Sequence, residues 1–302
     1  MNISRTQNWL CNNDGEVQSA VMGLNKAELR DIYIKDKQDV MTMVDGVKGI
    51  VNAETNDFCA SVSNRYTLLQ HGEYFQAFAE ALTRLGIKYK MIIKQSGNTA
   101  FADIDMQGRN IKFDKLNEEF MTGFRLINSY NRTTGISIMT RYTRLACMNG
   151  MILTKNVDVF SIRHSNKLVK EIDNQIELRL KNLVNENQEL QTWVSESLKD
   201  SQEWELCCKI IAKLITIPKH RDEVLKRLGI SAIDITDKKT KKRTTTFQWN
   251  VESEKKDKLT RWQIYNACTN YLQVSSISPS VEAFLQKQAE KILIKPLEIL
   301  AR

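Results

Sequence analysis

The chain has few prolines, few histidines and no long apolar run, and each shortage excludes a class of protein. Only three prolines stand among 302 residues, of which 42% are hydrophobic, so extended disorder is not expected. Three histidines are too few for a histidine-rich metal site. No apolar run approaches the roughly 20 residues of a membrane helix. The length suits one large or two smaller folded domains.

The six cysteines do not form the patterns of a disulfide or zinc framework. None pairs as C-x-x-C, and the adjacent Cys207 and Cys208 would point to different sides of a helix. The opening residues also lack the basic-then-apolar pattern of a secretory signal. We therefore expect a reduced, intracellular protein with small, mostly buried thiols.

The common enzyme signatures are missing as well. The sequence contains no G-x-x-x-x-G-K-[ST], G-x-G-x-x-G, H-E-x-x-H or G-x-S-x-G. His164 follows Arg163 in a basic stretch, where a surface polar role is favoured over that of a general base. The sequence thus predicts a protein that is not an enzyme, with no catalytic residue, metal ligand or cofactor.

Hydrophobic periodicity predicts an α+β fold, with an antiparallel sheet and packed helices in the N-terminal half. A helical stripe over residues 72–85 ends at Gly86, which suits a C-terminal cap. Before it, only short β-like runs stand out, at residues 31–34 and 58–62. After it, strands are predicted over residues 87–93, 99–106, 110–113, 122–130, 135–145 and 157–163, with a break at Gln107-Gly108.

Beyond residue 165 the period changes to that of helices. A long amphipathic helix is predicted over residues 168–198, with a break near residues 185–187. Further helices are predicted over residues 203–215, 221–228, 260–273 and 280–293. We therefore divide the chain into a mixed sheet domain, residues 1–165, and a mostly helical region, residues 166–302, with a basic loop at residues 237–243.

Residues 121–170 concentrate the positive charge of the chain. They hold eight Lys or Arg side chains and one acid, Asp158, which gives +7 of the net +8. A folded segment with so much like charge repels itself, and a polyanion such as nucleic acid relieves that repulsion. Interleaved aromatic residues add a means of stacking on bases.

Strand alternation indicates that not all of these arginines can face a nucleic acid. Arg141 and Arg144 would lie on opposite faces of one strand, so some arginines must pair internally, for example with Asp103 or Asp105. The predicted phosphate contacts are Arg125, Arg132, Arg141, Arg144, Lys155, Arg163 and Lys167, and the predicted stacking residues are Tyr130 and Tyr142. The competing interpretation is that the aromatic rings are core and the arginines are solvated.

A pair of acids supports a different chemistry. Asp103 and Asp105 alternate along a predicted strand, so both carboxylates face the same side. Paired carboxylates can hold Mg²⁺ against a phosphate, as a metal-dependent nuclease requires. The same alternation is also typical of the solvent side of a strand.

Three motifs in order resemble a known family. They are V-S-N-R-Y with H-G-E at residues 62–73, F-R-L-I-N-S-Y with R-L-A-C-M-N-G-M at residues 124–151, and W-Q-I-Y-N-A-C-T-N-Y at residues 262–271. Together they resemble the phage- and plasmid-borne family of unknown function numbered 932, over roughly residues 57 to 290. The resemblance implies a protein of a virus, prophage or plasmid, in the cytoplasm of a prokaryotic host, and supplies no catalytic residues. In outline the chain is also similar to annealases of the Redβ and Erf kind.

These observations lead to one hypothesis and two alternatives. The hypothesis is a nucleic-acid-binding protein that prefers single-stranded DNA, acts in recombination or replication by ATP-independent annealing, forms a homo-oligomer and has no membrane partner. The first alternative is a protein-interaction module, such as an inhibitor of host defence. The second is the metal-dependent nuclease that uses Asp103 and Asp105.

Overall fold

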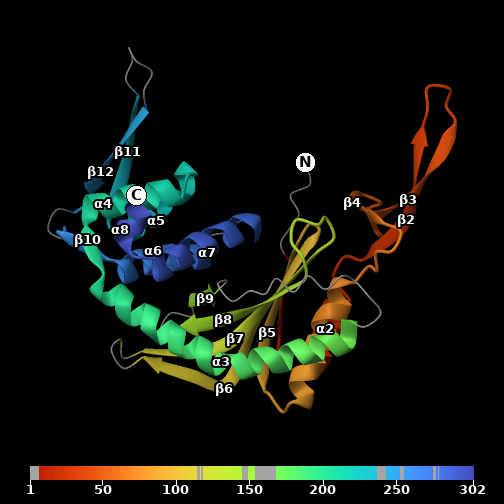
Figure 1. Cartoon of the computed structure of the whole chain (residues 1–302), viewed down its shortest axis with the longest axis horizontal. Helices are drawn as coiled ribbons and strands as arrows, with labels where there is room; N and C mark the ends of the chain where they lie inside the picture. The colour runs from red at the N-terminus through yellow and green to blue at the C-terminus, as the bar shows by residue number, and fades with distance from the viewer. Residues whose placement is uncertain are drawn as a thin grey trace. The chain divides into compact units, whose positions relative to one another are not determined.

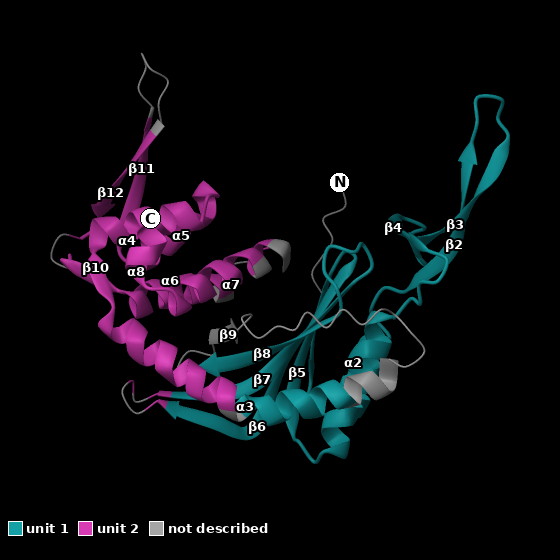
Figure 2. Cartoon of the chain, viewed as in Figure 1, with its two compact units in different colours: residues 1–112, 119–145, 152–184 teal, residues 113–118, 146–151, 185–302 magenta. Residues whose placement is uncertain are grey.

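The structure is a computed structural model that describes residues 7–113, 116, 118–144, 149–153, 168–236, 243–251, 255–274, 277 and 279–302. Strands lie mostly in the N-terminal half and helices mostly in the C-terminal half, which confirms the predicted α+β class (Figure 1). The chain forms two compact units (Figure 2). Within the described ranges, no helix is both long enough and apolar enough to cross a membrane.

Unit 1 comprises residues 1–112, 119–145 and 152–184 and is built around a six-stranded sheet. The strand order is β1-β5-β6-β7-β8-β9. The strands are β1 (Gln7–Cys11), β5 (Tyr89–Ser96), β6 (Thr99–Phe113), β7 (Glu118–Ser129), β8 (Ser137–Arg144) and β9 (Asn149–Leu153). β1 with β5, β5 with β6 and β7 with β8 are antiparallel pairs. The antiparallel sheet was predicted, but β1 was not among its predicted strands.

The predicted break at Gln107-Gly108 is wrong, because β6 runs through it as one strand. Gly108 has a φ of +74°, a left-handed conformation that glycine adopts without steric cost. The two strands predicted over residues 99–106 and 110–113 are therefore a single long strand.

Helices pack on one face of this sheet and form the main core. They are α1 (Asp14–Val21), α2 (His71–Arg84) and the first part of α3 (Leu168–Lys199). Phe75 and Phe78 of α2 meet Ile104 of β6 and Ile176 of α3 in one buried apolar cluster. The end predicted for α2 is confirmed, since Gly86 follows it with a φ of +68°.

The predicted break near residues 185–187 is wrong as well. α3 continues without interruption from Leu168 to Lys199, and the division between the two units falls inside it, after residue 184. Polar side chains at one point of a helical stripe do not end the helix when the backbone hydrogen bonds continue.

A second sheet of unit 1 consists of β2 (Ala27–Lys35), β3 (Met41–Asn52) and β4 (Phe58–Ser63). β2 and β3 form a long antiparallel hairpin (Figure 1). The sequence predicts only short β-like runs here, because Asp45, Gly46 and Gly49 weaken the strand pattern of β3. Gly46 adopts a φ of +75°, a left-handed conformation that is unusual within a strand.

Unit 2 comprises residues 113–118, 146–151 and 185–302 and is mostly helical. Its elements after α3 are β10 (Ser201–Glu203), α4 (Trp204–Leu214), α5 (Pro218–Arg227), β11 (Ile230–Thr236), β12 (Arg243–Trp249), β13 (Lys258–Thr260), α6 (Arg261–Val274), α7 (Pro279–Ile294) and α8 (Leu297–Ala301). The helices predicted at residues 203–215, 260–273 and 280–293 are confirmed. That predicted from residue 221 begins earlier, at Pro218.

A buried arginine ties these helices together. Arg261 is 1% exposed at the start of α6, and its backbone N–H donates to the carbonyl of Asp200 at 2.8 Å. The Asp200 carboxylate lies 3.6 Å from Arg261 Nε and accepts from the backbone N–H of Leu297 at 3.0 Å. The ends of α3, α6 and α8 therefore meet at one ion pair. Burial lowers the pKa of Arg261, whereas Asp200 and Glu196 favour its charged form.

Candidate nucleic-acid interface

The sheet face opposite the helices carries charges from three neighbouring strands. Alternation along β6 places Asp103 and Asp105 on this face, while Ala102 and Ile104 point into the helical core. Arg125 of β7 and Arg141 of β8 point to the same side as the two acids, since each is bonded to one of them. The predicted alternation of the acids is thus correct, and the arginines meet them.

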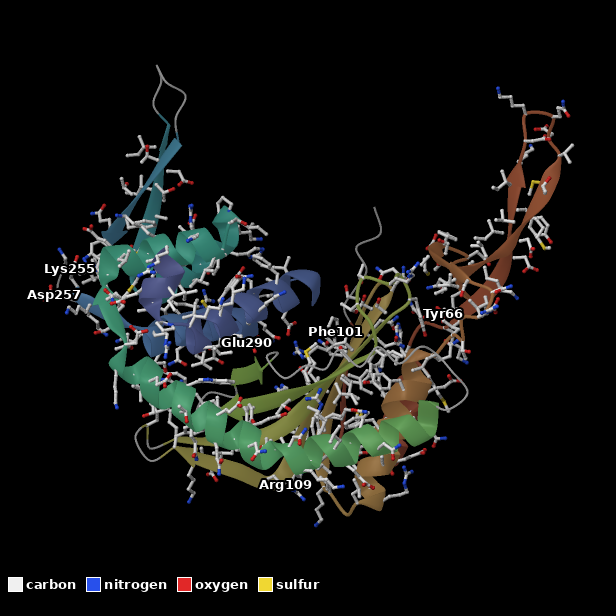
Figure 3. The ribbon with its side chains drawn as sticks, viewed as in Figure 1. Tyr66, Phe101, Arg109, Lys255, Asp257 and Glu290 are labelled. Atoms are coloured by element: carbon white, nitrogen blue, oxygen red, sulfur yellow. The ribbon has the colours of Figure 1, made fainter. Side chains whose placement is uncertain are left out.

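Arg125 and Asp103 form a bidentate ion pair. Arg125 Nε donates to Asp103 Oδ1 at 2.5 Å and Nη2 to Oδ2 at 2.7 Å. The side chains are 6% and 5% exposed. The guanidinium also lies 5.9 Å from the ring centroid of Phe101, a residue labelled in Figure 3. Burial opposes the charge of Asp103, but Arg125 and Arg141 outweigh it and hold the pKa of that carboxyl well below its usual range.

Arg141 and Asp105 form the second pair. Arg141 Nη1 donates to Asp105 Oδ1, which also accepts from Thr143 Oγ1 at 2.6 Å. Arg141 Nε lies 3.8 Å from Asp103 Oδ1, so the two pairs form one cluster. The predicted internal pairing of arginines is confirmed. The prediction that Arg125 and Arg141 contact phosphates is not supported, because their side chains are buried and bound to carboxylates.

Gly123 makes room for this cluster. It lies across from Arg141 in the register of β7 and β8. A Cβ at this position would stand 1.8 Å from the carbonyl oxygen of Ile104 on β6. Only glycine therefore allows β6 and β7 to approach this closely, and no side chain from this position competes with Arg141 for space.

The prediction that Tyr130 and Tyr142 stack on bases is not supported either. Tyr142 is 0% exposed, and Tyr130 is 1% exposed. The Tyr130 ring stacks on His71 with centroids 3.8 Å apart. Its hydroxyl accepts from the backbone N–H of His71 at 3.0 Å and donates to Gln70 Oε1 at 2.9 Å. Neither tyrosine has a ring face open to a nucleobase, because both side chains are buried. Strand alternation indicates which residues share a face of the sheet, but not whether other elements cover that face.

His71 is itself fully buried. Burial lowers its pKa to about 3, so the ring is neutral at physiological pH. The Asn98 backbone favours the charged ring, but burial outweighs this contribution. His71 therefore supports the start of α2 through packing on Tyr130.

The remaining predicted phosphate contacts are either outside the ion-paired cluster or outside the described residues. Arg132 is exposed in the turn between β7 and β8, where its Nη1 donates to the carbonyl of Ser61 at 3.0 Å. Arg144 is half-buried at the end of β8. Lys155, Arg163 and Lys167 lie outside the described residues, as do His164 and the strand predicted over residues 157–163.

The hairpin of β11 and β12 is a feature that sequence reasoning missed. The strands pair antiparallel from Ile230 with Trp249 to Thr236 with Arg243. Asp234 anchors the hairpin, since it accepts from Arg221 Nη2 at 3.2 Å and from Thr245 Oγ1 at 2.6 Å. The connection between the strands is the basic run at residues 237–243, which has five cations and one acid. Alternating Thr, Ile and Asp was the signal that should have indicated two strands here.

Fold and charge together define an α+β protein with an ion-paired sheet face in one unit and a basic hairpin in the other. Residues 59–291 match the family described as Domain of unknown function (DUF932), and the chain belongs to that family. Searches of curated proteins and of solved structures found no match. The family description names no activity.

Proposed function

We propose that this protein binds nucleic acid through the positive charge that the sequence concentrates in residues 121–170 and 237–243. This charge balance is the observation that carries the proposal. Residues 121–170 have a net charge of +7, and two of their cations, Arg125 and Arg141, pair with Asp103 and Asp105 outside the segment. Residues 237–243 add a second concentration of +4. A polyanion that meets these regions releases counterions and gains affinity.

The basic hairpin suits contact with a nucleic-acid backbone. A two-stranded ribbon is narrow enough to enter the major groove of a duplex. Lysines of the run at residues 237–243 would neutralise phosphates without reading sequence. Arg132 offers a second exposed contact in unit 1, since only its Nη1 is engaged among the described residues. The proposed interface therefore consists of Arg132, the basic run at residues 237–243, and the cations at residues 155, 163 and 167.

The biological role that we propose is recombination or replication of a virus, prophage or plasmid. In this role the protein, as a homo-oligomer, pairs complementary strands without ATP, as annealases of the Redβ and Erf kind do. The absence of a nucleotide-binding motif and the α+β class support this analogy. The preference for single strands rested on Tyr130 and Tyr142 and loses that support, because both rings are buried.

The test is fluorescence anisotropy with labelled single- and double-stranded oligonucleotides, with and without Mg²⁺. We expect binding at about 150 mM salt, close to physiological ionic strength. The probe should stay intact in both conditions. Absence of binding to either probe in the correctly folded protein would contradict the proposal.

A protein-interaction module is the second candidate, and the β2–β3 hairpin favours it. Tyr33, Ile34, Val40, Met41 and Met43 are between 52% and 61% exposed along this hairpin. Exposed apolar residues that cluster in this way are typical of protein contacts. This function, for example inhibition of host defence, predicts no affinity for oligonucleotides at physiological salt and a partner captured through the hairpin.

The nuclease alternative loses its support. A Mg²⁺ ion at Asp103 and Asp105 would have to displace the two arginines from their carboxylates. No group of three or more His, Cys, Asp or Glu side chains among the described residues is placed to hold a metal ion. An intact probe in the presence of Mg²⁺ would agree with this interpretation.

A further inference from the structure

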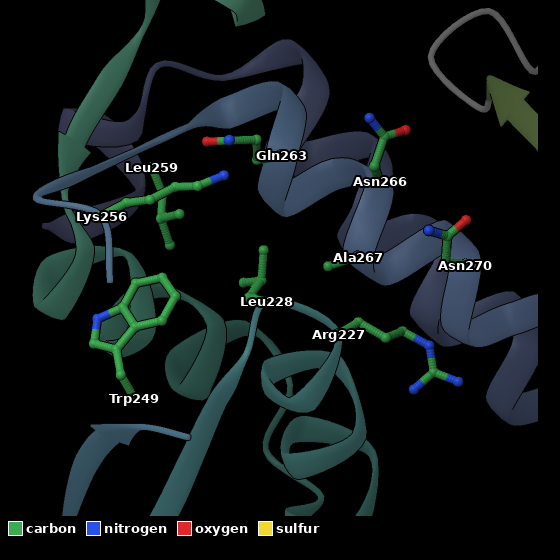
Figure 4. Close-up of a pocket in the computed structure, with 9 residues that line it drawn as sticks. All are labelled: Arg227, Leu228, Trp249, Lys256, Leu259, Gln263, Asn266, Ala267 and Asn270. Atoms are coloured by element: carbon green, nitrogen blue, oxygen red, sulfur yellow. The ribbon is translucent and has the colours of Figure 1, made fainter. Parts of the chain in front are cut away.

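Unit 2 contains a pocket that none of the predicted residues line. Its volume is about 230 Å³, and its polar lining consists of Arg227, Lys256, Gln263, Asn266, Asn270 and the indole of Trp249. The amides come from one side of α6, and Arg227 comes from the end of α5 (Figure 4). The same helix carries the W-Q-I-Y-N-A-C-T-N-Y motif.

Helical spacing brings the amides together. Gln263, Asn266 and Asn270 stand at positions i, i+3 and i+7 of α6, which lie on one face of a helix. Gln263 Oε1 accepts from the backbone N–H of Thr260 at 2.8 Å, which leaves its NH₂ group for the pocket. The Asn266 side chain is half-buried and has no partner among the described residues. The wall thus offers the side-chain NH₂ groups of Gln263 and Asn266 to a ligand as hydrogen-bond donors.

Arg227 and Lys256 line the pocket together with these amides, and none of the lining residues in the described part of the chain is an acid. Arg227 is held in place, since its Nη1 donates to the carbonyl of Glu223 at 2.7 Å and to Glu223 Oε2 at 3.0 Å. Its guanidinium lies 4.8 Å from the ring centroid of Tyr271. Its Nε and Nη2 groups have no partner among the described residues. Lys256 is exposed and contributes a mobile ammonium group.

The volume and the charge of the pocket limit the chemical class of ligand that it can bind. A pocket of about 230 Å³ lies below the roughly 300–1,000 Å³ of sites that enclose a whole small molecule. It therefore takes one group of a larger ligand. A terminal phosphate carries a charge of about −1.5 to −2, which matches the two cations better than the single charge of an internal phosphodiester.

We propose that this pocket binds the terminal phosphate of a nucleic-acid strand, with Arg227 and Lys256 on the phosphate and the α6 amides on the adjoining polar groups. The inference rests on the proposed function for its choice of a strand as the source of the phosphate. It assigns the DUF932 motif helix a ligand-binding role in addition to its packing role. The hairpin would bind the strand anywhere, whereas the pocket would bind its end.

The experiment compares the full chain with single-stranded oligonucleotides that carry or lack a terminal phosphate at either end. Anisotropy should show about tenfold tighter binding for the phosphorylated strand. Lys256→Gln and Asn266→Ala should each remove most of this gain. Lys258→Gln is the matched control, since it removes one exposed lysine outside the pocket and should keep the gain.

Each result decides between the two proposals. Equal affinity for both strands, or a gain that survives Lys256→Gln and Asn266→Ala, would overturn the pocket and leave the proposed function standing. Absence of binding to every oligonucleotide would overturn both the proposed function and the strand as ligand. Titration with a mononucleotide, followed by tryptophan fluorescence, then shows whether a free phosphate ester occupies the pocket. A signal that Lys256→Gln abolishes would retain the phosphate site alone.

Discussion

Arg125 and Asp103 lie on neighbouring strands and share two hydrogen bonds, of 2.5 Å and 2.7 Å, in an almost fully buried environment. Arg125 was a predicted phosphate contact and Asp103 a candidate Mg²⁺ ligand, but in the fold they bind each other. A guanidinium whose Nε–Nη2 edge is bound in this way, on a side chain that is 6% exposed, offers no open fork to a phosphate. The positive charge that remains for a partner is therefore elsewhere in the chain.

Loss of one partner should destabilise the fold strongly. Arg125→Met leaves the Asp103 carboxylate buried without its principal partner, which we expect to cost about 3–5 kcal/mol in the free energy of unfolding. Urea denaturation measures this cost. Arg132→Met, at an exposed turn, is the control and should change stability by less than about 0.5 kcal/mol. Equal stability of the two variants would contradict a structural role for the Arg125–Asp103 pair.

The double variant Arg125→Met with Asp103→Leu should recover most of the lost stability. Replacement of a buried ion pair by apolar side chains of similar volume removes the cost of burying charge. Comparison of the two single variants with the double variant gives the coupling between the residues. Additive losses would show that the pair contributes nothing of its own.

Acid should reduce stability in two steps. The pKa of His71 is lowered to about 3 by burial, so the unfolded state binds a proton that the folded state does not. Its contribution is fully present above about pH 6.5 and declines as pH falls, with a loss of roughly 2 kcal/mol at pH 5. The pKa of Asp103 is held low by Arg125 and Arg141, so its contribution declines only below about pH 4.

Thermal unfolding from pH 7 to pH 3 separates these steps. His71→Phe should remove the decline between about pH 6.5 and pH 4 and keep the one below it. Asp103→Asn should do the opposite, although it also lowers stability at pH 7. A pH profile of His71→Phe that matches that of the unmodified chain would show that His71 titrates normally in the fold.

Gly123→Ala should prevent correct folding or destabilise it by about 3 kcal/mol or more, because the new Cβ would meet the backbone of Ile104 at 1.8 Å. Soluble yield and thermal unfolding report this effect. Gly15→Ala in α1 is the matched control, since its Cβ would meet nothing closer than 3.4 Å. A Gly123→Ala variant as stable as Gly15→Ala would show that β6 and β7 are further apart than described.

The basic hairpin connection should govern affinity and leave stability unchanged. Replacement of Lys238, Lys239, Lys241 and Lys242 by Gln should weaken binding to all oligonucleotides alike and flatten the dependence of affinity on salt. Replacement of Lys35 and Lys37 by Gln, at the end of the β2–β3 hairpin, should leave both unchanged. Equal effects of the two variants would assign the binding to net charge alone.

The sequence predicted the parts of the fold that repeat a period. α2 with its cap at Gly86, α4, α6 and α7 all follow from apolar spacing, and the pairing of arginines with Asp103 and Asp105 follows from strand alternation. It did not predict that β6 continues through Gly108, because a positive φ permits either a turn or a continued strand.

The candidate site was harder to predict than the fold. Tyr130 reads as a surface aromatic in a basic stretch, yet it packs on His71, which is 59 residues away in the chain. Asn266 belongs to the W-Q-I-Y-N-A-C-T-N-Y motif and was not among the predicted site residues, yet it lines a pocket with Arg227, from another helix. Contacts of this kind depend on which elements pack together, and local patterns carry no information about that.

The most direct test of the central claim is the affinity for a labelled oligonucleotide as a function of salt concentration. The account predicts that the logarithm of the association constant falls linearly with the logarithm of salt, and that the lysine-to-glutamine hairpin variant shows a smaller slope. Undetectable binding even at about 50 mM salt, where phosphate contacts are strongest, would contradict the account and favour a protein partner for the basic surface.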